Sequence, residues 1–294
     1  MEGIKMLQQS TLDDDMLSEI IDAVFDSSSS DSEASSTYKK PHGSRPGRAP
    51  NVNRGHAMGA DRLYQDYFAP NAVYNERLFR RRFRMQRELF IRIVQGIKTH
   101  DEYFEQRFDA LNVPGLSTLQ KITAAIHQLA YGTPADACDE YIRISESTAQ
   151  KCLDKFAQAM IDKYGPVYLR SPTPEDLERT LRINAARGFP DCAGSLDCYA
   201  WRWDKCPKAK QGQYKGHKGT SIILEAAVDG DLWFWHAHVG FPGSLNDINV
   251  VQRSSLICLT LHDIVNGACH QVSYVVNHQI YTTPYWLVDG IYPR

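Results

Sequence analysis

Two aspartates each lie in a short apolar run that predicts a β-strand. Asp197 lies in GSLDCYAWRW (194–203), and Asp289 lies in YWLVDG (285–290), which predicts a buried strand. Carboxylate oxygens are hard ligands that suit Mg²⁺ and Mn²⁺. Two such ions on shared carboxylates can activate an attacking water or hydroxyl and stabilise the leaving oxygen in phosphodiester cleavage. The two aspartates could do this chemistry if their strands lie side by side.

The segments between the two aspartates predict how they are positioned. Residues 220–229 and 232–240 predict a hairpin, and residues 246–256 predict a helix. The order strand, strand, strand, helix, strand is that of an RNase H-like domain, in which the fourth strand lies beside the first. We therefore expect a mixed α/β fold in which residues 186–294 form this domain and bring the two aspartates together.

Residues 56–185 predict a helical region. Within 116–165, Ser117 is placed to cap one helix and Ser145 to cap another, with a break at Gly132 and a short helix between them. Helix, short helix, turn and long helix is a helix-turn-helix plan, and three-helix packing without DNA contact is the alternative. In this plan the third helix presents its first residues to a DNA groove. These residues are Glu146, Ser147, Thr148, Gln150 and Lys151.

Two basic segments are further candidates for contact with DNA. Residues 76–97 combine arginines with apolar residues at helical spacing, and the lysine-rich loop 204–219 follows the first predicted strand. Clustered Lys and Arg supply much of the affinity for DNA, but such runs are also ordinary solvated surfaces. The candidate side chains are Arg80, Arg81, Arg82, Arg84, Lys208, Lys210, Lys215 and Lys218.

The composition is that of an ordinary globular protein, with 294 residues, 43% apolar residues and a net charge of −2. Residues 1–55 predict a disordered tail, which is acidic and Ser-rich and ends in a Pro/Gly/Arg linker. Within it, 12–26 has the spacing of a short amphipathic helix that either docks on a partner or has no function. No signal peptide or apolar run of membrane-spanning length is present, so we expect an intracellular protein.

The seven cysteines have no regular spacing and predict no disulfide framework. The candidate zinc ligands are Cys192, Cys198, Cys206 and His217, but the spacing between them fits no common zinc-binding pattern. A hard-cation site on the aspartates is therefore the stronger expectation.

Five segments together resemble the DDE transposase domain of the PIF/Harbinger superfamily, which includes domesticated nuclease-like relatives. The resemblance implies that Asp197 is the first and Asp289 the second catalytic carboxylate, that Mg²⁺ or Mn²⁺ is the cofactor, and that DNA is the partner. It also implies a nuclear location and a Myb-like accessory protein. The segments are FRRRFRM (79–85), LAYGTPADACDEYIRISESTA (129–149), GSLDCYAWRWDKCPKAKQGQYKGHKG (194–219), LEAAVDGDLWFWHAHVGFPGSLNDINVVQRS (224–254) and LVDGIYP (287–293).

Two features qualify the resemblance. Asp247 matches a further acidic position of the family, and it could hold metal, support the site or cap the helix that it begins. The family's final catalytic glutamate lies on a later helix, whereas this sequence ends at Arg294. We therefore expect a metal-dependent DNA endonuclease domain truncated before that glutamate. The alternative is a non-catalytic DNA-binding protein or gene fragment descended from a transposase.

Overall fold

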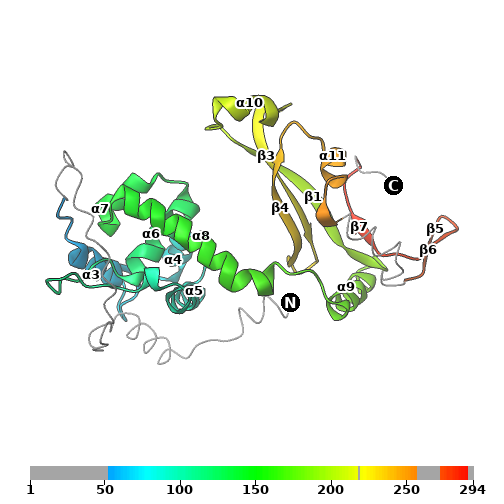
Figure 1. Cartoon of the computed structure of the whole chain (residues 1–294). Helices are drawn as coiled ribbons and strands as arrows, with labels where there is room; N and C mark the ends of the chain where they lie inside the picture. The colour runs from blue at the N-terminus through cyan, green and yellow to red at the C-terminus, as the bar shows by residue number, and fades with distance from the viewer. Residues whose placement is uncertain (1–51, 218, 257–271, 291–294) are drawn as a thin grey trace, which may run out of the picture. The chain divides into compact units, whose positions relative to one another are not determined.

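A computed structural model describes residues 52–217, 219–256 and 272–290. The expected tail, apart from its last residues, and the candidate Lys218 lie outside these ranges. The chain divides into a helical unit that ends at Lys163 and a sheet unit that begins at Tyr164, and each is described by itself (Figure 1). None of the helices within the described ranges has the length and apolar character needed to cross a membrane.

The helical unit is built around a core of stacked aromatic rings. Phe79 and Phe83 stack with ring centroids 4.2 Å apart, and Phe90 meets Phe83 edge-on at 4.9 Å. All three rings are fully buried. The helices are α3 (His56–Tyr67), α4 (Glu76–Phe83), α5 (Arg87–His100), η1 (Glu102–Phe104), α6 (Thr118–Tyr131), η2 (Ala135–Cys138), α7 (Asp139–Ile142) and α8 (Glu146–Tyr168), the last of which runs into the sheet unit.

The predicted helix, short helix and long helix correspond to α6, η2 with α7, and α8. Ser117 and Gln120 form a reciprocal capping box at the start of α6, which satisfies amide groups that have no partner within the helix. Gly132 ends α6 in a left-handed conformation with φ of 63°, which suits a residue without a Cβ. Cap chemistry at both ends thus fixes the length of α6.

The arginine-rich segment forms two helices. Arg84, with φ of 60°, ends α4, and α5 begins three residues later at Arg87. The break lets Phe83 on α4 and Phe90 on α5 enter the same core.

The sheet unit contains the predicted strand order, and the mixed α/β fold is confirmed. The strands lie in the order β4-β3-β1-β7, where β1 pairs antiparallel with β3 and parallel with β7. The first and fourth predicted strands are therefore neighbours. The elements are α9 (Pro174–Ala186), β1 (Cys192–Arg202), α10 (Lys208–Tyr214), β2 (Lys215–Gly216), β3 (Gly219–Val228), β4 (Phe234–Pro242), α11 (Asp247–Val251), β5 (Tyr274–Val276), β6 (Gln279–Tyr281) and β7 (Tyr285–Leu287).

The structure differs from the sequence prediction at three elements. Helix α9, which the sequence boundary near 185 placed with the helical region, belongs to the sheet unit, because Asn184 donates to the Cys192 carbonyl on β1 at 2.8 Å. The lysine-rich loop contains the short helix α10. The two-stranded hairpin β5-β6 was not predicted.

The two faces of the sheet differ. On one face, Leu196 of β1 and Ala227 of β3 are buried and contact Val251 of α11 and Trp286 of β7. The opposite face of β1 carries Asp197, which is exposed. Because side chains alternate along a strand, the residues of β1 that follow Asp197 at intervals of two share its face.

Candidate metal site and basic surfaces

The parallel pairing of β1 and β7 gives the two aspartates matching positions beyond the last paired residues. The last paired residues are Ser195 and Leu287, and Asp197 and Asp289 each lie two residues further along. Because side chains two apart on a strand share a face, Asp197 lies on the face of Ser195, whereas Asp289 comes just after the end of β7. Both aspartates are exposed.

The local contacts of Asp197 leave much of its carboxylate available. Its Oδ1 accepts a hydrogen bond of 2.7 Å from the backbone amide of Cys198. An exposed carboxylate within β1 and another just after β7 are of the type that suits a hard divalent cation that keeps several waters. Within the described ranges, however, no three Asp, Glu, His or Cys side chains gather closely enough to hold a metal by themselves.

The same search of the described residues covers the candidate zinc ligands. Cys192 and Cys206 are both buried in the sheet unit, yet they do not join a cluster of three metal-binding side chains among the described residues. Burial raises the pKa of the Cys192 thiol, which makes the metal-binding thiolate less available.

Asp247 is not the residue that caps α11. The N-cap is Asn246, whose side chain accepts a hydrogen bond of 2.8 Å from the amide of Asn249. Asp247 is the first residue of the helix, where a negative charge is favourable beside the free amides. The capping role considered for Asp247 is therefore wrong.

The arginines of α4 divide into exposed and engaged side chains. Arg82 is half-buried, donates to the hydroxyl of Tyr67 and lies over the ring of Tyr74 at 3.8 Å. It therefore stabilises the helical unit, a role that the sequence pattern did not reveal. The exposed arginines on this segment are Arg77, Arg80, Arg81 and Arg84.

The start of α8 has the exposure that the helix-turn-helix plan requires. Ser147, Gln150 and Lys151 are exposed, whereas Thr148 exchanges a hydrogen bond of 2.8 Å with the Ser145 hydroxyl. Three polar side chains therefore remain on the outer face of the helix at its positive end.

Lysines lie beyond the end of β1. Lys208 and Lys210 are exposed on α10, and Lys215 is exposed on β2. Figure 1 shows α10 at the end of the sheet opposite to α9.

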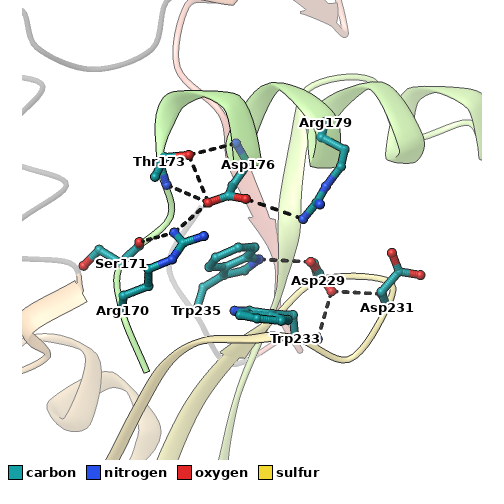
Figure 2. A network of polar contacts seen from close by, with 9 residues as sticks. All are labelled: Arg170, Ser171, Thr173, Asp176, Arg179, Asp229, Asp231, Trp233 and Trp235. Carbon is teal, nitrogen blue, oxygen red and sulfur yellow. Dashed lines mark hydrogen bonds and ion pairs between the residues drawn. The ribbon is translucent and has the colours of Figure 1, made fainter. Parts of the chain in front are cut away.

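A polar network that the sequence prediction missed connects α9 with the turn between β3 and β4 (Figure 2). Asp229 accepts bonds from the amides of Asp231 and Trp233 and from Nε1 of Trp235. Arg170 pairs with Asp176 at 2.6 Å and lies over the Trp235 ring. The run DGD (229–231) was the available turn signal.

Asp176 also forms a capping box with Thr173 at the start of α9. Burial alone would raise its pKa, but the hydrogen bonds from Arg170 and Thr173 outweigh burial and lower the pKa of this carboxyl. The ionised carboxylate therefore stabilises the start of α9. The sequence TPED (173–176) carried the signal for this helix start.

A pocket of about 310 Å³ lies between α9 and the sheet, on the side of the strands that carries Ser195 and Leu287. Arg187 and Asp229 contribute charged groups to its wall. It adjoins the start of β1 and the last residue of β7.

The two histidines of β4 have structural contacts. His236 Nε2 lies 3.0 Å from Oε2 of the fully buried Glu225, and the ring of His238 packs on Phe241 with centroids 4.4 Å apart. Both histidines therefore have partners within the sheet unit.

Comparison with known proteins relates both parts of the chain to families. Residues 166–294 match the family described as Plant transposon protein, and residues 59–98 match a domain of unknown function, DUF8418. The chain is 25% identical over 174 residues to "Protein ALP1-like" of Arabidopsis thaliana, covering 58% of this chain and 42% of that protein. It is 22% identical over 182 residues to "Putative nuclease HARBI1" of Homo sapiens, covering 60% and 50%.

The chain spans about half the length of these relatives. No solved structure matches it. The Plant transposon match covers every strand that the structure describes and includes both Asp197 and Asp289. The matched family, the two relatives and the strand order agree, and the chain is a relative of the PIF/Harbinger-type DDE transposases.

Proposed function

We propose that this chain is a transposase-derived, metal-dependent DNA endonuclease. The observation that carries the proposal is the parallel pairing of β1 with β7, because Asp197 and Asp289 each follow the last pair, Ser195 and Leu287, by two residues. The name of the human relative, "Putative nuclease HARBI1", supports the same class of reaction.

Asp197 and Asp289 would hold Mg²⁺ or Mn²⁺ through their carboxylate oxygens. The bound ions would activate the attacking water or DNA 3′-hydroxyl and stabilise the leaving oxygen. The Cys198 amide orients the Asp197 carboxylate through its hydrogen bond at Oδ1. Asp247, at the start of α11, is a further candidate ligand or support for the site.

The basic side chains would position the DNA. Phosphate contacts orient a protein on DNA without reading its sequence. We propose that the exposed arginines of α4 and the lysines around α10 make these contacts, while Ser147, Gln150 and Lys151 of α8 approach a groove. Arg82, which is engaged with Tyr67 and Tyr74, would support the arginine surface from within.

A non-catalytic DNA-binding protein is the second candidate. The observation that favours it is the absence, among the described residues, of any cluster of three metal-binding side chains. A two-metal site holds its cations more weakly with fewer shared carboxylates, because less negative charge faces them. For either candidate, a nuclear location and a Myb-like partner follow from the resemblance and are tested by localisation and co-purification.

The deciding experiment measures nicking of supercoiled DNA with Mg²⁺ or Mn²⁺ by the purified chain and by Asp197→Ala and Asp289→Ala variants. Glu178→Ala is the matched control, because it removes an exposed carboxylate from α9 of the same unit. If the chain is a nuclease, we expect the wild type and Glu178→Ala to nick the plasmid and the two aspartate variants not to. A folded wild-type chain that binds DNA and does not nick it would establish the second candidate.

A further inference from the structure

Two aromatic side chains lie exposed on the face of β1 that carries Asp197. Tyr199 and Trp201 follow Asp197 at intervals of two and each is 62% exposed. Their rings meet edge-on with centroids 5.8 Å apart. β1 therefore presents a carboxylate and then two large rings in line on one face.

These rings are not part of the core of the sheet. Leu196, on the other face of β1, is 3% exposed, and Trp203 at the end of the strand packs edge-on against Tyr214 of α10. A tyrosine and a tryptophan left exposed side by side are unusual, and such an aromatic surface commonly marks a binding site.

The chemistry around the rings indicates what they bind. Residues 204–217, directly after β1, contain four lysines and one aspartate. Lys208, Lys210 and Lys215 are exposed there. A carboxylate that could hold a cation lies on one side of the rings and a positively charged surface follows on the other. Aromatic rings beside a basic surface suit single-stranded nucleic acid, whose bases stack while its phosphates contact cations.

We propose that Tyr199 and Trp201 form a stacking platform for unpaired bases of the DNA on which Asp197 and Asp289 act. The proposal rests on the proposed function in that DNA is the substrate. Trp201 lies four residues beyond Asp197, or about 13 Å along an extended strand. Bases stacked on the platform would therefore adjoin the phosphodiester presented to the carboxylates, and both rings are positioning residues.

The test separates stacking from charge. Fluorescence anisotropy would measure binding of the full chain, in EDTA, to a short oligothymidylate and to an abasic oligonucleotide of the same length and charge. We expect the wild type to bind the oligothymidylate about tenfold more tightly. Trp201→Ala should lose most of this preference while its affinity for the abasic strand stays unchanged.

Matched variants make the result specific. Lys208→Ala should weaken binding of both oligonucleotides equally, because it removes a phosphate contact. Trp201→Phe keeps a ring and should retain most of the preference, and Tyr199→Ala should lower it independently. Ile280→Ala removes an exposed apolar side chain from β6 and should change nothing.

Several results would overturn the platform. The first is an equal affinity of the wild type for the two oligonucleotides. The second is a folded Trp201→Ala variant whose affinity falls equally for both oligonucleotides. If Trp201→Ala does not fold, a Tyr199→Ala variant with an unchanged preference for the oligothymidylate overturns the platform instead. Binding in EDTA is independent of cleavage. A chain that fails to nick plasmid but keeps a base preference that depends on Trp201 would overturn the nuclease and leave the platform standing.

Discussion

The helical unit and the sheet unit stabilise their elements differently. In the helical unit, fully buried rings from α4 and α5 meet in one core, and Ser117 caps α6 while itself buried. In the sheet unit the buried contacts lie on one face around Leu196 and Ala227, while the other face of β1 carries exposed polar and aromatic groups. The comparison shows that the helical unit closes its core on all sides of the stacked rings, whereas the sheet unit leaves polar and aromatic groups of β1 exposed.

The largest expected effect tests the aromatic core. Phe79→Ala removes a fully buried ring that stacks on Phe83, so we expect the free energy of unfolding of the helical unit to fall by about 3–5 kcal/mol. Urea unfolding followed by far-UV circular dichroism measures the loss. All five tryptophans lie in the sheet unit, so their fluorescence should report a smaller change.

Val73→Ala is the control for this variant. Its side chain is 66% exposed, and we expect a change within about 0.5 kcal/mol. A Phe79→Ala protein as stable as this control would show that the stacked rings do not hold the helical unit together.

A half-buried histidine, His127, makes the same core sensitive to acid. Burial, with a smaller contribution from Arg82, lowers the pKa of His127 to about 4. In the unfolded chain this pKa is about 6.5, so the unfolded state binds more protons between these values. Stability should therefore be complete above pH 6.5 and fall by about 3 kcal/mol as the pH drops to 4.

Urea midpoints of the helical unit measured across this pH range test the prediction. His127→Leu removes the titrating group and should flatten the profile in this window. An equally steep profile in His127→Leu would assign the acid sensitivity to other groups.

Matched capping boxes compare the two units directly. Ser117 is 8% exposed, whereas Thr173 at the start of α9 is exposed. Ser117→Ala leaves a buried amide without its partner and should cost about 2 kcal/mol, while water can replace the Thr173 hydroxyl and Thr173→Ala should cost about 0.5–1 kcal/mol. Unfolding of each variant by denaturant gives the two values, and a larger loss for Thr173→Ala would reverse the comparison.

The sequence predicted the elements whose signals are local. Apolar runs and turn residues located the four main strands, and their order predicted the pairing of β1 with β7. Cap residues at Ser117 and Gly132 located α6. These elements could be predicted without tertiary contacts, because the residues that cap a helix also mark its ends in the sequence.

What the sequence could not predict depends on tertiary contacts. Residues 198–201 (CYAW) are all apolar, yet Tyr199 and Trp201 are exposed, because an apolar run does not tell which strand face is covered. Arg82 resembles its neighbours in sequence, but only the fold places it over Tyr74. Of the roles that the sequence left open for Asp247, capping falls to its neighbour Asn246, a distinction that depends on where the first turn of α11 begins.

The smallest expected effect concerns the hairpin β5-β6 of the sheet unit, whose strands are largely exposed. Asn277 and His278 form its two-residue turn with φ of 51° and 66°. Such turns favour Asn followed by Gly, because a left-handed conformation is costly for a residue with a Cβ. His278→Gly removes this cost, and the greater freedom of glycine in the unfolded chain offsets part of the gain. We expect a stabilisation of about 0.5 kcal/mol.

Tryptophan fluorescence during urea unfolding measures the stability of the sheet unit, and His278→Ala is the control that keeps the Cβ. If His278→Ala stabilises the sheet unit as much as His278→Gly does, the imidazole and not the backbone conformation limits the hairpin.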